Sequence, residues 1–294
     1  MLQFILVFVF CTGALAQAIL GVTPVLPSAT IELRDPRSLS VAADGTLFIA
    51  DTGHHRVLAM DATGKLVVES GGFGTEHGQF QWPRKVIADR GTSVWVLDYG
   101  NRRIEKFSRT LEYQGTFFIP SDDDSRPRQI EEMAVSPQGD LYVFDRDGGR
   151  LLRYDPLFRV QAELGQDRGQ EFISALSRMT FVPKLGLVWW ERGRPEVRVA
   201  DPLLTQIRTL RLNYDGSAAS MILAASDSCL VFGTSKALRS WCDPALPPDS
   251  LFSLTADPGM NLKRLDDIAF ANRHAMYVLD GLAGAVYRVS LSER

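Results

Sequence analysis

The chain has 294 residues, of which 45% are hydrophobic and 23% charged, a globular composition that excludes disordered and collagen-like sequence. Its 32 basic and 35 acidic residues give a formal charge of −3, so no basic excess indicates a nucleic-acid partner. The 24 glycines and 15 prolines are spread along the chain and favour many turns between short strands.

The first segment of the chain, from Leu2 to Val22, is almost uninterrupted apolar sequence. Within it, Ala14-Leu15-Ala16 is a site of the kind that signal peptidase cleaves, which predicts a signal peptide over 1–16 and a mature chain from Gln17. An uncleaved anchor over 1–22 is the alternative, because about 20 apolar residues span a bilayer, and a buried core helix is a third interpretation. The first two predict a secreted or periplasmic protein, which contacts the membrane only if the anchor remains.

A strand-like run that ends in an acidic or polar residue recurs six times after this segment. The six runs end at Asp51, Asp98, Asp145, Glu191, Thr234 and Asp280. A second run with strand periodicity precedes each of them, and a turn such as Asp44-Gly45 separates the two as in a hairpin. Further short apolar runs follow most end-points. Four short antiparallel strands per repeat predict the blade of a propeller.

Six repeats therefore predict an all-β fold, a six-bladed β-propeller of four-stranded antiparallel blades, as a single domain over 29–291. The last repeat ends after its third strand, while Ala29-Thr-Ile-Glu-Leu33 is an unmatched strand before the first repeat. We expect these two to pair, so that the N-terminal strand closes the ring in the last blade and leaves no exposed edge.

The first two repeats also share a residue pattern. In the first, Pro36-Arg37 is followed by Phe48-Ile-Ala-Asp51 and Gly53-His-His-Arg-Val57; in the second, Trp82-Pro-Arg-Lys-Val86 is followed by Trp95-Val-Leu-Asp98 and Gly100-Asn-Arg-Arg-Ile104. This pattern resembles the NHL repeat over residues 36–108. It is fair in repeats three and six and poor in repeats four and five. The resemblance implies a six-bladed propeller, a fold that hosts unrelated functions.

The acidic end-points are interpreted as structural turn acids rather than as a catalytic or metal-binding ring. These residues are Asp51, Asp98, Asp145, Glu191 and Asp280. In the first three repeats an arginine follows five residues later, at Arg56, Arg103 and Arg150. Across a hairpin, that spacing lets the carboxylate accept turn amides and pair with the guanidinium.

Other candidate reactive groups do not assemble into a catalytic set. The four histidines, His54, His55, His77 and His274, are too few on one face for a zinc site, which needs three or four converging ligands. Asp122-Asp123-Asp124 lacks the ligand spacing of a calcium loop. There is no nucleophile elbow and no phosphate loop. The sequence therefore predicts no catalytic residue, no metal and no cofactor.

A ring of aligned residues is predicted at the mouth of the channel, fourteen positions before each end-point. Its members are Arg37, Arg84, Glu131, Ser177, Ser220 and Asp266. Closure of the ring places Asp266, Arg37, Arg84 and Glu131 in consecutive blades. Neighbouring guanidiniums suit a carboxylate or phosphate, so one interpretation is a ligand-binding site with Trp82 in its wall. The alternative is a structural belt in which Arg37 pairs with Asp266 and Arg84 pairs with Glu131.

The predicted function is a non-enzymatic binding or scaffold module for a protein, a peptide or a small anionic ligand at the channel mouth, with no nucleic-acid partner. The alternative is a metal-dependent lyase or hydrolase of the amidating-lyase or gluconolactonase type, which the family resemblance also allows.

Two cysteines, Cys229 and Cys242, flank the predicted hairpin of the fifth repeat. Residues that are directly opposed on neighbouring strands are close enough to be bridged. The pair is therefore a candidate disulfide, and two unpaired thiols are the alternative.

Overall fold

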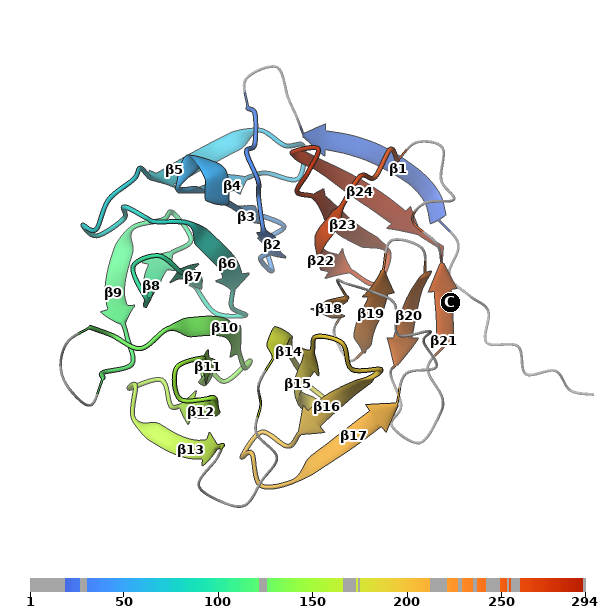
Figure 1. The fold of residues 1–294 in the computed structure, drawn as a ribbon. Helices are drawn as coiled ribbons and strands as arrows, with labels where there is room; N and C mark the ends of the chain where they lie inside the picture. The colour runs from blue at the N-terminus through green and yellow to red at the C-terminus, as the bar shows by residue number, and fades with distance from the viewer. Residues whose placement is uncertain are drawn as a thin grey trace, which may run out of the picture.

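The computed structural model describes residues 19–26, 31–121, 126–165, 173, 175–211, 221–226, 229–234, 237–241, 249–252, 254 and 260–292. Over these residues the chain forms six four-stranded antiparallel sheets, which stand as blades around a common axis (Figure 1). The predicted all-β, six-bladed propeller is therefore confirmed. No helix in this part of the chain is long and apolar enough to cross a membrane.

In the first five blades, the four strands follow the chain order from the axis outward. In the last blade, the outermost strand comes from the start of the chain. The first three blades are β2 (Ser38–Val41), β3 (Leu47–Asp51), β4 (Arg56–Met60) and β5 (Leu66–Gly71); β6 (Pro83–Ala88), β7 (Ser93–Asp98), β8 (Arg103–Ser108) and β9 (Tyr113–Phe117); and β10 (Ile130–Val135), β11 (Leu141–Asp145), β12 (Arg150–Tyr154) and β13 (Val160–Leu164). A 3₁₀ turn, η1 (Thr52–His54), joins β3 to β4.

The other three blades complete the ring. They are β14 (Leu176–Val182), β15 (Gly186–Glu191), β16 (Glu196–Ala200) and β17 (Ile207–Arg211); β18 (Ile222–Ala225), β19 (Leu230–Thr234), β20 (Ala237–Trp241) and β21 (Asp249–Phe252); and β22 (Leu265–Asn272), β23 (Ala275–Asp280), β24 (Ala285–Leu291) and β1 (Ile19–Leu26).

The second strands of the blades are continuous apolar runs because both of their faces are covered by neighbouring blades. Every residue of β7 and β15 is buried. Between the first two blades, for example, Phe48 and Val57 pack against Val86 and Val96 in one apolar cluster. The outermost strands, such as β5 and β17, have mostly exposed or half-buried residues because nothing covers their outer side. The core is thus a set of layers between blades.

Strand β1 closes the ring by pairing antiparallel with β24, so the last blade holds strands from both ends of the chain (Figure 1). Closure by an N-terminal strand is confirmed, but that strand lies earlier than the expected 29–33. Ala29 and Thr30 lie outside the described residues, and Ile31 and Leu33 are buried without belonging to any strand. The apolar residues that alternate over 29–33 include Ile31 and Leu33, which pack in the apolar layer between the sixth and first blades. Such burial produces the same alternation as a strand without any strand pairing.

The innermost strands carry a repeated irregularity near the point where they enter the sheet. In the second blade Pro83 pairs with Asp98 and Lys85 pairs with Leu97, so Arg84 is an extra residue in the register. The same shift occurs in the third, fourth and sixth blades, where the extra residues are Glu131, Ser177 and Asp266. A β-bulge of this kind re-aims the side chain that it inserts. Most of the predicted mouth residues therefore lie on bulges.

Candidate functional site

The end-point acids hold the turns beside the mouth. Asp98 is fully buried and accepts hydrogen bonds from the Gln81 amide (2.7 Å), the Asn101 side chain (2.6 Å) and Nε of Arg103 (2.9 Å). Asp51 and Asp145 make the equivalent contacts with Arg56 and Arg150, at 2.8 and 2.9 Å. Burial raises the pKa of Asp98. These contacts are those of a structural turn acid.

In the fourth and sixth blades, the end-point acid has other hydrogen-bond and ion-pair partners. Glu191 lies 3.3 Å from Nε of Arg198 and 3.4 Å from Nε of Arg194, and no arginine stands at the usual position. Asp280 accepts backbone amides from the connector and its own turn, including that of Ala283 at 2.9 Å. Five of the six blades thus keep a buried carboxylate at this point, while the donors that satisfy it vary and the fifth blade has Thr234 instead.

Around Asp266, four charged side chains from the sixth and first blades form what we call the Arg264 cluster: Asp35, Arg37, Arg264 and Asp266. Asp266 is buried and accepts from Nε of Arg264 (2.6 Å) and from the Gly281 amide (2.9 Å). Arg37 lies 2.9 Å from Asp35 and 3.8 Å from Asp266. Burial raises the pKa of Asp266. Two guanidiniums face two carboxylates here, so the cluster is balanced in charge.

A second group of residues, the Arg84 cluster, lies between the second and third blades and consists of Arg84, Tyr99, Glu131 and Arg146. Glu131 lies 3.3 Å from Arg84 and 3.4 Å from Arg146, and its other contact is the Tyr99 hydroxyl at 3.2 Å. The guanidinium of Arg84 stacks 3.5 Å above the Tyr99 ring. The Glu131 carboxylate raises the pKa of Arg146. Two cations share one carboxylate, so this side of the mouth carries an excess positive charge.

Trp82 lies on the connector that leads into Arg84. Its side chain is 51% exposed, and its backbone has a φ of 54°, a left-handed conformation that strains a bulky residue. The Trp82 amide donates to Nδ1 of His55 (3.2 Å), and a Cβ at Gly100 would lie 2.9 Å from the Trp82 ring. The His55 ring in turn contacts the exposed Phe73 ring at 5.1 Å. An aromatic surface therefore adjoins the Arg84 cluster.

One residue deeper than the bulges, polar side chains bridge neighbouring blades. Lys85 lies 3.3 Å from Glu132, and its Nζ donates to the Met179 carbonyl at 3.5 Å. On the other side of the axis the Ser38 hydroxyl donates to Asp267 at 2.8 Å. We call this the inner layer. Its residues come from the first, second, third, fourth and sixth blades, and they lie beneath the mouth.

The structure brings the predicted pairs together: Arg37 with Asp266, and Arg84 with Glu131. Ser177 is half-buried on its bulge, and Ser220 lies outside the described residues. Sequence reasoning missed Tyr99, Arg146 and Arg264. Tyr99 and Arg146 directly follow the end-point acids Asp98 and Asp145, so the position after each acid was the available signal.

The remaining sequence candidates are placed as follows. His54 contacts Asp51 at 2.9 Å, and His77 stacks on Tyr113 at 4.1 Å. Asp122-Asp123-Asp124 lies outside the described residues. Among the described residues, no three His, Cys, Asp or Glu side chains group so as to hold a metal ion.

Cys229 forms a disulfide. Cys242 lies outside the described residues, while the neighbouring pair Leu230 and Trp241 are directly opposed between β19 and β20. The pairing of Cys229 with Cys242 therefore stays a prediction.

Comparison with known proteins supports the architecture. Residues 33–60 match the model of the NHL repeat. No curated protein matches the sequence. Similar solved structures include a streptogramin B lyase (TM-score 0.65, 11% identity, 92% of this chain and 98% of that chain) and a virginiamycin B lyase from Staphylococcus aureus (TM-score 0.63, 11% identity, 92% and 99%).

A third similar structure, that of U3-55K, has a TM-score of 0.66 and 11% identity and covers 92% of this chain and 98% of that chain. At such identities these likenesses show the fold alone, because one fold hosts unrelated functions. The repeat match, the six blades and these neighbours agree with one another. The chain is a six-bladed β-propeller that carries an NHL repeat in its first blade.

Proposed function

We propose that this protein is an exported, non-enzymatic binding module, and that the Arg84 cluster holds an acidic segment of a protein or peptide. The observation that carries the proposal is the charge imbalance at this side of the mouth. Arg84 and Arg146 are 43% and 60% exposed and share the single carboxylate of Glu131. A carboxylate from a partner would give each guanidinium its own anion, which suits the planar fork of arginine.

Trp82 supports the same assignment. Exposed tryptophan beside arginine is the composition of protein-binding hot spots, because both offer large contact areas. Its strained backbone is also typical of functional positions. The Arg264 cluster offers no comparable charge, since its two arginines already face two carboxylates.

Cleavage after Ala16 is supported by the place of strand β1 in the last blade. Strand β1 starts at Ile19, two residues after the predicted mature start at Gln17. An anchor over 1–22 would take residues that β1 uses in the last blade, where Ile19 pairs with Leu291. N-terminal sequencing of the protein expressed with its leader tests this proposal. We expect Gln17 as the first residue, and a membrane-bound chain that begins at Met1 would overturn it.

The binding proposal is tested with a biotinylated peptide of alternating Glu and Gly, titrated by biolayer interferometry. The Arg84→Gln and Arg146→Gln variants should each weaken binding about tenfold, the effect of losing a hydrogen bond to a charged group. Arg37→Gln is the matched control, because Arg37 is 44% exposed yet belongs to the balanced cluster. Equal weakening by all three variants, or no saturable binding, would contradict the proposal.

The second candidate function is a lyase, favoured by the likeness to two proteins described as lyases over 92% of this chain. Incubation with quinupristin tests it directly, because a further similar structure is that of a catalytically inactive virginiamycin B lyase from Staphylococcus aureus with this compound. Conversion seen by liquid chromatography and mass spectrometry would favour the lyase. Unchanged quinupristin together with peptide binding would favour the binding module.

A further inference from the structure

Three aromatic rings lie together on the mouth side of the first two blades, and we call them the aromatic triad: His55, Phe73 and Trp82. His55 follows the turn η1, Phe73 follows β5 and Trp82 precedes β6, so each stands where the chain passes the mouth. The half-buried His55 ring contacts the Phe73 ring at 5.1 Å and the Trp82 ring at 6.0 Å, measured between ring centroids. One half-buried ring thus joins two exposed ones.

Phe73 is 66% exposed, yet the backbone around it is held in place. The Gly72 carbonyl accepts the Phe80 amide at 2.9 Å. On the other side of Phe73, the Gly74 carbonyl accepts the Asn101 side chain at 2.8 Å. A ring that is exposed on an ordered backbone loses little conformational freedom when a partner covers it, which favours binding.

The backbone at Trp82 is held in a similar way. The Gln81 amide donates to Asp98 at 2.7 Å, and the Gln81 carbonyl accepts the Gly100 amide at 2.7 Å. The amide of Trp82 itself donates to the His55 ring at 3.2 Å. These bonds maintain the left-handed conformation that keeps the indole at the surface.

The aromatic triad is continuous with the Arg84 cluster. Tyr99 carries the stacked guanidinium of Arg84, and Gly100 follows it in the chain. A Cβ at Gly100 would lie 2.9 Å from the Trp82 ring, so glycine lets the indole lie against the backbone there. Adjacent exposed rings form an apolar surface of the kind that marks an interaction site, and here that surface borders two exposed arginines.

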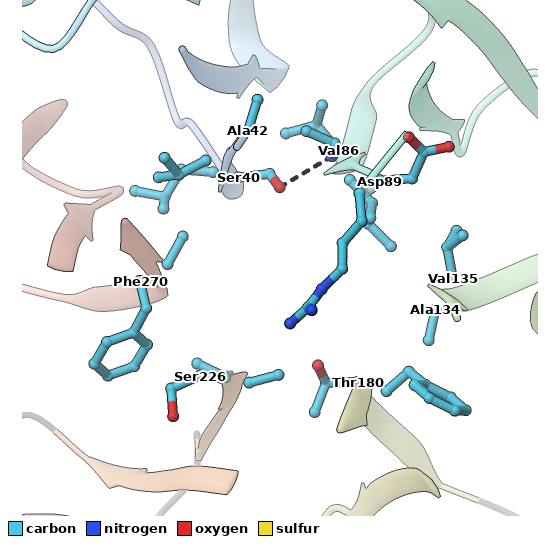
Figure 2. Close-up of a pocket in the computed structure, with 18 of the residues that line it drawn as sticks. Ser40, Ala42, Val86, Asp89, Ala134, Val135, Thr180, Ser226 and Phe270 are labelled. Carbon is cyan, nitrogen blue, oxygen red and sulfur yellow. Dashed lines mark hydrogen bonds between the residues drawn. The ribbon is translucent and has the colours of Figure 1, made fainter. Parts of the chain in front are cut away.

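The cavity along the axis is a separate feature (Figure 2). Its volume is about 500 Å³, and its wall mixes polar side chains such as Asp89 and Thr180 with apolar ones such as Val86 and Phe270. Neither the aromatic triad nor the Arg84 cluster lines it. A bulky apolar group held by the triad would therefore lie on the face of the mouth, outside this cavity.

We infer that the aromatic triad binds a bulky apolar side chain of the same partner segment whose acidic group the Arg84 cluster holds; the inference rests on the proposed function. Burial of that side chain against Phe73 and Trp82 removes apolar surface from water and supplies affinity. The arginines supply the requirement for an acid. The partner is thus an acidic segment with a leucine-like residue close to its acids, rather than a uniformly charged polyanion.

Biolayer interferometry with three matched peptides tests this inference. One is the alternating Glu and Gly peptide, and in the other two a leucine replaces the glycine at one end or at the other. Because a glutamate stands at every second position, each leucine peptide offers several spacings between leucine and carboxylate. At least one of them should bind about tenfold more tightly, the effect of burying part of a leucine side chain. Equal affinity for all three peptides would overturn the inference.

Two variants test whether the triad causes the gain. Phe73→Ala and Trp82→Gly should each remove most of it, and glycine at position 82 adopts the left-handed backbone without strain. Leu157→Ala is the matched control, because Leu157 is 71% exposed but lies in the turn between β12 and β13 and is not part of the triad. A gain that survives Phe73→Ala, or that Leu157→Ala removes equally, would overturn the inference. The peptide comparison on the unchanged protein decides even if Trp82→Gly does not fold.

The Arg84→Gln variant separates this inference from the proposed function. It should weaken binding of all three peptides alike. If it weakens none of them, or if no peptide binds, the proposed function fails and the inference fails with it. If the Glu and Gly peptide binds in an Arg84-dependent way and leucine adds nothing, only the inference fails. Light scattering that shows a dimer lost in Phe73→Ala would also overturn it, because a second copy of the chain would then cover the triad.

Discussion

In the second blade, Asp98 ends the second strand and faces Arg103 across the hairpin. The fourth blade has Glu191 at the first of these positions and Glu196 in place of the arginine. Both carboxylates are buried. Arg194 contacts both acids of the fourth blade, at 3.4 and 3.7 Å, and Arg198 adds a further cation. In both blades the buried carboxylate at this point is therefore satisfied by a cation, and that cation can come from a different position in the turn or on the third strand.

The largest expected effect comes from removing the acid of the second blade. Asp98→Ala removes the carboxylate that faces Arg103, leaves the Gln81 amide without this acceptor and takes one of two acceptors from Asn101. Breaking a buried ion pair from one side costs about 3–5 kcal/mol. Chemical denaturation should show that loss. Thr234→Ala, at the same position in the fifth blade, is the control and should cost about 1 kcal/mol or less, because no charge is removed.

The fifth blade lacks the end-point acid, and its disulfide is expected to compensate. If Cys242 is the partner, Cys229→Ser should lower the free energy of unfolding by about 3 kcal/mol, the value for a short closed loop. In that case, alkylation without reductant of a chain that begins at Gln17 should add no label to either cysteine. Two labels by intact mass would show that the predicted pair is wrong.

Restoring the usual arginine should make the fourth blade resemble the second. Glu196→Arg replaces an acid beside Glu191 with a cation, and we expect a gain of about 0.5–1 kcal/mol, the scale of a partly exposed ion pair. Thermal and chemical unfolding measure it. A loss of stability would indicate that Arg194 depends on Glu196 for its position.

The smallest expected effect concerns pH. Burial raises the pKa of Glu105, on β8 of the second blade, above its ordinary value of 4.5. The folded protein therefore holds this proton more tightly than the unfolded chain does, and the resulting stability is lost as pH rises through the raised value. The free energy of unfolding of the wild type minus that of Glu105→Gln should fall between about pH 4 and pH 7. A rise of this difference with pH would mean that the attraction of Arg103 lowers the pKa of Glu105 by more than burial raises it.

The fold could be predicted from the sequence because the second strand of each blade is a continuous apolar run, and because residues typical of turns separate the strands of the hairpins. The closing strand was misplaced because Ile19 to Leu26 is as apolar as the residues before it, so composition does not distinguish the strand from the predicted signal peptide. The mouth residues could be located, since they precede the end-points at a fixed distance. Their bulges could not, because alternation on the two sides of one extra residue looks the same as alternation alone.

The charge balance of the mouth also could not be predicted from the sequence. Arg146 and Tyr99 come from turns between the second and third strands, and only the folded ring places them beside Glu131. The repeat pattern does not specify the residue after the end-point acid. It therefore does not indicate which blades carry a charged or aromatic side chain at that position.

The pairing of β1 with β24 has a mechanical consequence. The two strands are antiparallel, and Ile19 at the start of one lies opposite Leu291 at the end of the other. A pulling force applied through both ends of the chain would therefore separate the strands one hydrogen bond at a time, like a zip, rather than load all of those bonds together in shear. Under tension the ring would open at its last blade, while the other five blades carried little of the load.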